Sequence, residues 1–314
     1  MIRTVTGDID PDDLGFTYSH EHLIGAPPVG KRSDEDLVIL DEEKGLQEAR
    51  AAAAVGVRSL YEASAWDYSR NPAALRRISE QSGVQIIACG GFNKGEWFDD
   101  LLADVPLEEL VQRIVTDVQT GMDGTDVRAG AIKYGTAYNR ITPTEEKVLR
   151  AAARAHRATG AVLHGHTETG TMALRQLDLL ADEGVDLNRV GIVHLMRNPD
   201  PFLHKQIARR GTYLCNGGSP KSSSSRKTPG LAARLEIIGP GHADRVRTGG
   251  DLARRTDLTA YTGGPGLHYI AGEWLPRFRA ELSERGYSDA DLDELQRLFF
   301  VENPKRYFSF GEPY

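Results

Sequence analysis

The chain has 314 residues, of which 40% are hydrophobic and 26% are charged, and its formal net charge is −7. We expect a globular protein with a sizeable core, and the acidic balance excludes a nucleic-acid partner. No apolar stretch reaches the ~20 residues that cross a membrane, so we expect no membrane association. The first ten residues lack the apolar segment of a secretory signal, and Cys89 and Cys215 both lie in apolar runs. These features favour buried thiols in a cytoplasmic protein.

Short apolar runs of strand character alternate with longer helical patterns along the chain. The predicted strands are residues 15–20, 57–63, 84–91, 129–135, 160–166, 189–195, 211–217 and 244–251. The predicted helices include residues 41–56, 106–121, 142–160, 171–184 and 202–211. In the third of these, Thr142 stands before Pro143 and two glutamates, as is typical of a helix N-terminus. Residues 220–230 are Ser-rich and are predicted to form a loop.

Eight alternations of strand and helix predict an α/β fold, a (β/α)8 TIM barrel formed by residues 1–314 as a single domain. A doubly wound sheet is the alternative, but it expects a glycine-rich phosphate loop after the first strand. The segment that follows the first strand here, "SHEHLIG", is not such a loop. A barrel also requires the chemistry to lie at the C-terminal ends of its strands.

Titratable side chains stand at five of the eight predicted strand ends. His20 and His22 are two residues apart on the first strand, so their side chains point to the same face. The full set is His20, His22, Lys133, His164, His166, His194 and Asp251. Imidazole and carboxylate groups that converge on one barrel mouth are typical metal ligands, so the sequence predicts a metal site there.

Lys133 is the unusual member of this set, because an ammonium among histidines and metal ions would be desolvated and repelled. One interpretation pairs it with an acid at another strand end, such as Glu62. In the other interpretation the amine is neutral and combines with carbon dioxide. The resulting carbamate carries a negative charge and two oxygens, and could bridge two metals.

The chain resembles the phosphotriesterase family of the amidohydrolase superfamily, and in particular its lactonase and sugar-lactonase members. The resemblance covers nearly the whole chain and rests on "LGFTYSHEHL", "AGAIKYGTAYNRITPTEEKVLRAAARAHRATG", "HTETGT", "DRVRTGGD", "GGPGLHYI" and "ENPKRYFSF". It implies two divalent metal ions, usually zinc, with manganese or cobalt as alternatives. It also implies the following ligands: His20, His22 and Asp251 on the buried metal, His166 and His194 on the outer metal, and carboxylated Lys133 between them.

Two of these residues have alternatives. His166 precedes a turn at the barrel rim and is favoured as the ligand of the fifth strand, while His164 would lie one layer deeper. Asp251 alone could be a helix cap, but within this set we interpret it as a ligand and as a catalytic residue. It would take the proton of a hydroxide that bridges the metals and pass it to the leaving group.

The resemblance implies a metal-dependent hydrolase for a small molecule, most simply a lactonase. The substrate would be a sugar lactone, phosphorylated or carboxylated, because cations occur in the loops after the seventh and eighth strands. Lys221, Arg254 and Tyr261 match the family's substrate contacts best, with Arg255 as an alternate. A phosphotriesterase, or another ester or amide hydrolase on the same metals, is the alternative. Similar proteins are commonly homodimers.

Two segments depart from the family pattern. An acidic residue usually stands two positions after the histidine that corresponds to His194, but this chain has Met196 there, followed by Arg197. After the third strand, where many lactonases have tyrosines, the chain reads "GGFNKGEW". Both segments are expected to border the substrate pocket, so the departures bear on the substrate and leave the metal ligands intact.

Overall fold

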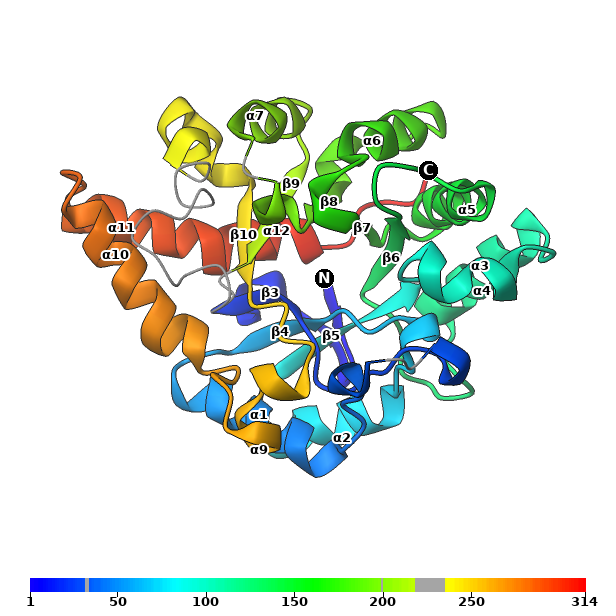
Figure 1. The fold of residues 1–314 in the computed structure, drawn as a ribbon, viewed down its shortest axis with the longest axis horizontal. Helices are drawn as coiled ribbons and strands as arrows, with labels where there is room; N and C mark the ends of the chain where they lie inside the picture. Colours follow the sequence, from blue (N-terminus) through cyan, green and yellow to red (C-terminus); the bar gives the residue numbers. More distant parts are fainter. Residues whose placement is uncertain (32–33, 199, 218–234) are drawn as a thin grey trace.

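The computed structural model describes residues 1–31, 34–198, 200–217 and 235–314, and within them it has the predicted (β/α)8 barrel (Figure 1). Neighbouring strands are parallel and follow one another around the barrel in chain order. They are β3 (Thr17–Glu21), β4 (Ser59–Glu62), β5 (Gln85–Gly91), β6 (Ala131–Thr136), β7 (Val162–Thr167), β8 (Val190–Val193), β9 (Tyr213–Gly217) and β10 (Val246–Gly249).

The barrel closes where β10 meets β3. The backbone N–H of Asp251 donates to the carbonyl of His20 at 3.0 Å. Gly249 makes this approach possible, because a Cβ at that position would lie 2.5 Å from the backbone nitrogen of His20. The glycine therefore sets how closely two strands that carry candidate ligands approach each other.

Helices surround the strands on the outside of the barrel (Figure 1). They are α1 (Glu42–Ala54), α2 (Pro72–Ser82), α3 (Gly95–Leu102), α4 (Leu107–Gln119), α5 (Pro143–Thr159), α6 (Ala173–Asp182), α7 (Pro201–Arg209), α9 (Thr259–Thr262), α10 (Leu275–Ser283), α11 (Asp289–Arg297) and α12 (Asn303–Phe308). Each of the five predicted helices occurs, within two residues of its expected ends. None of these described helices is long and apolar enough to cross a membrane.

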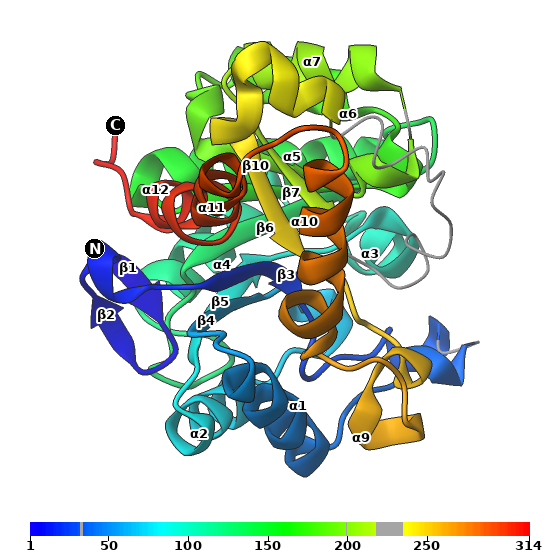
Figure 2. The same cartoon turned by 90° about the vertical axis from the view of Figure 1, so that its left-hand side faces the viewer.

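The chain ends lie together on one side of the barrel. An antiparallel hairpin of β1 (Ile2–Thr4) and β2 (Gly7–Ile9) lies on the same side as α12 (Figure 2). From α12, the buried Tyr307 reaches into the barrel and donates its hydroxyl hydrogen to the carbonyl of Leu163, at 2.6 Å. Cys89 and Cys215 are both buried and are not joined in a disulfide, as predicted.

Helix α5 begins with the motif that the sequence suggested. Thr142 Oγ1 accepts from the backbone N–H of Glu145 at 3.1 Å, and Glu145 Oε2 accepts from the backbone N–H of Thr142 at 2.9 Å. This reciprocal capping box satisfies two donors that the first helical turn would otherwise leave free. It fixes the start of the helix that follows β6, the strand carrying Lys133.

Replacing Thr142 with alanine is expected to lower the free energy of unfolding by about 1 kcal/mol, because the Glu145 N–H loses its acceptor. Urea unfolding of Thr142→Ala and of the control Thr144→Ala, two residues on, measures this. The control is expected to stay within about 0.5 kcal/mol of the parent. Equal losses in both variants would contradict a capping role.

Candidate metal centre

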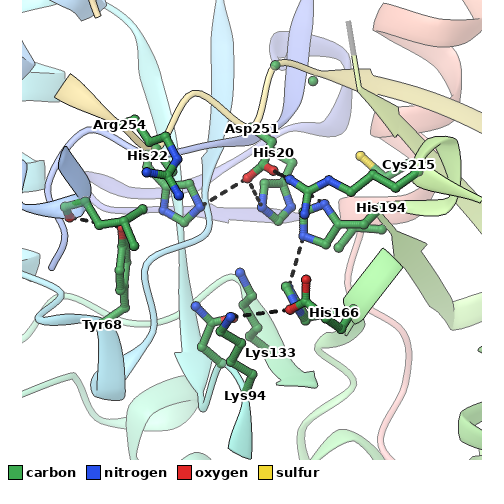
Figure 3. Close-up of a pocket in the computed structure, with 18 of the residues that line it drawn as sticks. His20, His22, Tyr68, Lys94, Lys133, His166, His194, Cys215, Asp251 and Arg254 are labelled. Carbon is green, nitrogen blue, oxygen red and sulfur yellow. Dashed lines mark hydrogen bonds and ion pairs between the residues drawn. The ribbon is translucent and has the colours of Figure 1, made fainter. Parts of the chain in front are cut away.

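The strand-end residues that the sequence singled out come together at the C-terminal mouth of the barrel (Figure 3). They come from β3 and the residue after it, from β6 and β7, and from the residues that follow β8 and β10. Those that line one cavity of about 460 Å³ are His20, His22, Lys133, His166, His194 and Asp251. His164 lies below them, fully buried.

Asp251 is at the centre of the cluster. Its Oδ1 lies 3.4 Å from His20 Nε2 and 3.7 Å from His22 Nε2. Its Oδ2 lies 3.4 Å from His194 Nδ1. One nitrogen of His20, one of His194 and one carboxylate oxygen of Asp251 all lie within 4.8 Å of one another, as the ligands of a single ion would.

Two members of the cluster have unusual backbone geometry. His194 has φ 66° and Asp251 has φ 52°, both in the left-handed region that non-glycine residues seldom adopt. His194 directly follows β8, and Asp251 follows β10 after Gly250, so both left-handed residues lie where the chain leaves a strand. Such strain costs of order 1–3 kcal/mol per residue and is concentrated at functional sites, which fits the role of these two side chains.

His166 and His194 form the second half of the cluster. His194 Nε2 and His166 Nδ1 are 3.0 Å apart. The other nitrogen of His166 lies 3.3 Å from Glu168 Oε2, and that carboxylate oxygen also contacts Lys94 Nζ at 3.3 Å. Nothing in the sequence pattern pointed to Glu168, because it follows the strand in the "TETG" turn.

Lys133 points upward into the space between the histidines (Figure 3). Its Nζ donates to the carbonyl of Ala63 at 2.9 Å, and the residue is only 1% exposed. The alternative partner, Glu62, is engaged elsewhere and accepts from the backbone N–H groups of Leu23 and Ser64. Burial lowers the pKa of the Lys133 amine, which favours the neutral form that carbamate formation requires.

The donor set of the cavity fits metal ions. His20 Nε2 is buried and makes no hydrogen bond to any residue that the structure describes, while His20 Nδ1 lies 2.8 Å from His164 Nε2. Likewise, His22 Nδ1 is 2.9 Å from Ser64 Oγ. In both residues the nitrogen that faces away from Asp251 is held by the protein, and the other is left for a ligand bond. This division of the two ring nitrogens is typical of metal-binding histidines.

Protonation states agree with this arrangement. Burial lowers the pKa of His20 to about 3 and the pKa of His166 to about 4, so both rings are neutral near pH 7. Burial alone would raise the pKa of Asp251, but His194, His20 and His22 outweigh it and hold that pKa well below its usual range. The cavity therefore offers an ionised carboxylate together with the neutral imidazoles of His20 and His166.

Cations line the outer part of the same cavity. They are Lys94 after β5, Arg197 after β8 and Arg254 after β10. The Arg254 guanidinium contacts Asp34 and Asp36, whereas Arg197, with its side chain 52% exposed, donates to Asp251 Oδ2 at 3.0 Å. Lys94 and Arg197 belong to the two segments that depart from the family pattern, and this departure was the available signal for them.

Of the other two predicted substrate residues, only Tyr261 belongs to the part of the chain that the structure describes. Tyr261, in α9, is not among the described residues that line the cavity; its hydroxyl accepts from the backbone N–H of Asp41 at 3.1 Å. The Lys44 ammonium lies over its ring, 4.4 Å from the centroid. Lys221 falls in 218–234, outside the described residues.

Comparison with known proteins decides the family. The model of the phosphotriesterase family matches residues 1–308. The chain belongs to this family. A lactonase of Listeria monocytogenes has a solved structure that superposes with a TM-score of 0.94, at 39% identity and 99% coverage of both chains.

Two further relatives match nearly the whole chain. The phosphotriesterase homology protein of Escherichia coli K12 is 33% identical over 300 residues, covering 95% of this chain and 99% of that protein. A phospho-furanose lactonase of Mycoplasmopsis synoviae is 29% identical over 335 residues, covering 99% and 92%. This phosphotriesterase-family chain is therefore a hydrolase that acts on ester bonds, in a family of binuclear metal hydrolases.

Proposed function

We propose that the protein is a lactonase that depends on two divalent metal ions, with zinc as the expected metal. One ion would be held by His20, His22 and Asp251, and the other by His166 and His194. Lys133 would contact both ions as a carbamate formed with carbon dioxide. The observation that carries this proposal is the convergence of these side chains in one cavity around Asp251, where the buried Nε2 of His20 has no hydrogen-bond partner within the described part of the chain.

Metal ions held by these residues would supply Lewis acidity, which lowers the pKa of water and withdraws charge from a carbonyl oxygen. Asp251 would take the proton of that water on its carboxylate and return it to the ring oxygen that leaves. Two observations support this role of Asp251. Its carboxylate is ionised, and its Oδ2 faces Arg197, which lines the same cavity. The product is a hydroxy acid, whose ionisation releases a proton.

The proposed substrate is a sugar lactone with a phosphate or carboxylate group. Lys94, Arg197 and Arg254 line the outer part of the cavity, although the formal net charge of the protein is −7. Guanidinium and ammonium groups in this position favour a substrate with an anionic group, because they form charge-assisted hydrogen bonds with phosphate or carboxylate oxygens. The name of the Mycoplasmopsis relative, a phospho-furanose lactonase, supports the same substrate class.

Purified protein is expected to contain about two divalent metal ions per chain, and a strong chelator is expected to remove both metal and activity. Elemental analysis measures the content before and after chelation, and hydrolysis is assayed in parallel. Added zinc should restore activity to the chelated protein. A preparation that holds only traces of metal after growth with added zinc, yet hydrolyses esters, would contradict the metal centre.

The substrate is tested with a library of lactones, each in a phosphorylated or carboxylated form and in a neutral form, and a pH indicator reports ring opening. The proposal expects the highest kcat/KM on an anionic lactone. The alternative is a phosphotriesterase or another ester or amide hydrolase on the same metals, so phosphotriesters and N-acyl compounds are included. Faster turnover of one of these than of every lactone would overturn the lactonase assignment.

A further inference from the structure

Beneath the cavity, a chain of buried polar groups leads from the barrel interior to His20. His164 is fully buried on β7, where it is paired with Lys133 on β6 and with Gly191 on β8. Its Nε2 lies 2.8 Å from His20 Nδ1, and its Nδ1 lies 3.4 Å from the hydroxyl oxygen of Tyr307. His164 thus connects a candidate ligand with a residue from the last helix of the chain.

The donor and the acceptor of each hydrogen bond in this series are determined by its last bond, the one between Tyr307 and Leu163. A backbone carbonyl can only accept, so the hydroxyl hydrogen of Tyr307 is committed to the carbonyl of Leu163, at 2.6 Å. The Tyr307 oxygen then offers lone pairs only, and a hydrogen on His164 Nδ1 can point to it. A neutral His164 with its hydrogen on Nδ1 has a bare Nε2, which must accept from His20 Nδ1.

The opposite arrangement is unfavourable. If His164 Nε2 donated to His20, the bare Nδ1 of His164 would face the lone pairs of Tyr307 in a buried site. An imidazolium at His164 is also disfavoured, because the ring is buried and Arg247 is nearby. The Arg247 guanidinium is fully buried and lies over the Tyr307 ring, 3.5 Å from its centroid. A second positive charge beside it would be costly.

We propose that His164 and Tyr307 are positioning residues that fix the tautomer of His20, with the hydrogen on Nδ1 and the lone pair on Nε2. The Nε2 atom lies 3.4 Å from Asp251 Oδ1 and forms no hydrogen bond with any of the described residues. The inference rests on the proposed metal centre for its purpose, because a metal needs a bare nitrogen. The tautomer itself is a property of the protein and can be measured without a metal.

The first measurement is the nitrogen NMR spectrum of the histidine side chains in chelated protein near pH 7. We expect His20 and His164 both to carry their hydrogen on Nδ1, and Tyr307→Phe to shift both rings toward a mixture of tautomers. This variant keeps the ring under Arg247 and removes only the hydroxyl. A hydrogen on Nε2 of His20 in the parent protein would overturn the proposal, whether or not the protein binds metal.

The second measurement is zinc affinity, obtained by competition with a chelator. Loss of a hydrogen-bond partner behind a metal ligand typically weakens affinity ten- to a hundredfold, and we expect a loss of about this size in His164→Phe and a smaller one in Tyr307→Phe. His164→Gln, whose amide oxygen can accept from His20 Nδ1, is expected to recover most of the affinity. Zinc binding in His164→Phe equal to the parent would overturn the proposal.

The chain offers a matched control. His156 is another buried histidine held by a tyrosine: its Nδ1 lies 2.7 Å from the carbonyl of Ala161 and its Nε2 lies 3.1 Å from the Tyr314 hydroxyl. Tyr314, unlike Tyr307, is exposed, and Tyr314→Phe removes its hydroxyl from behind a histidine that lies outside the cavity; zinc affinity is expected to stay unchanged. Equal losses in Tyr314→Phe and Tyr307→Phe would show a general loss of stability and overturn the positioning role. Absence of zinc binding in the parent would instead contradict the proposed function.

Discussion

Lys133→Ala is expected to lose both metal ions and to lower kcat/KM by roughly a thousandfold or more, because several kcal/mol of transition-state stabilisation depend on the metals. The residue is 1% exposed, lies between the two groups of proposed ligands and donates only to the carbonyl of Ala63 among the described residues. Short carboxylates added with zinc should partly restore metal and activity, since a free carboxylate can occupy the place of the bridging carbamate. Elemental analysis and kinetics, with and without added formate or acetate, measure both effects.

A second lysine is the control for this variant. The Lys147 amine is also held by backbone carbonyls, those of Leu102, Ala103 and Val105, but outside the cavity. Lys147→Ala is expected to lose stability while it keeps its metal and gains nothing from carboxylates. Full metal content in Lys133→Ala would show that the amine has only a structural role, and the proposed carbamate would be wrong.

Much of the fold and of the cluster could be predicted from the sequence because both depend on local patterns. Alternating runs determine the strands, and the alternation of side chains along a strand places His20 and His22 on one face. A parallel barrel then brings all the strand ends to one mouth. Asp251 indicates a metal ligand only together with the other strand-end residues. Taken alone, an aspartate after two glycines and before a helical segment could as well be a helix cap.

The partners of the cluster could not be predicted, because they depend on how separate loops meet. Arg254 was expected to be available to substrate, but its contacts with Asp34 and Asp36 come from a segment more than 200 residues away in sequence. The position of Tyr261 beside Asp41 depends on a similar long-range contact. The hydrogen bond between His164 and His20 also links two strands that are not neighbours in the barrel.

The cations around the cavity give the second large expected effect. If Arg254 or Lys221 binds the anionic group of the substrate, each charge-assisted hydrogen bond contributes roughly 1.5–3 kcal/mol. Arg254→Ala and Lys221→Ala should then lower kcat/KM on the anionic lactone by about ten- to a hundredfold. Hydrolysis of the matched neutral lactone should change little, and metal content should stay full.

The structure adds Arg197 to this series, because its half-exposed guanidinium reaches the cavity and contacts Asp251 Oδ2. When Asp251 binds metal, that contact competes with the metal for the carboxylate, which leaves Arg197 free to meet an anionic group of the substrate. Arg197→Ala should therefore show the same selective loss.

Arg277, exposed and paired with Glu273 on the outside of the barrel, is the control. Solvated loop charges predict weak, salt-screened losses of similar size on both lactones. Equal losses on the two substrates would leave the anionic substrate without support, whereas a loss confined to the anionic lactone would identify the arginines that select it.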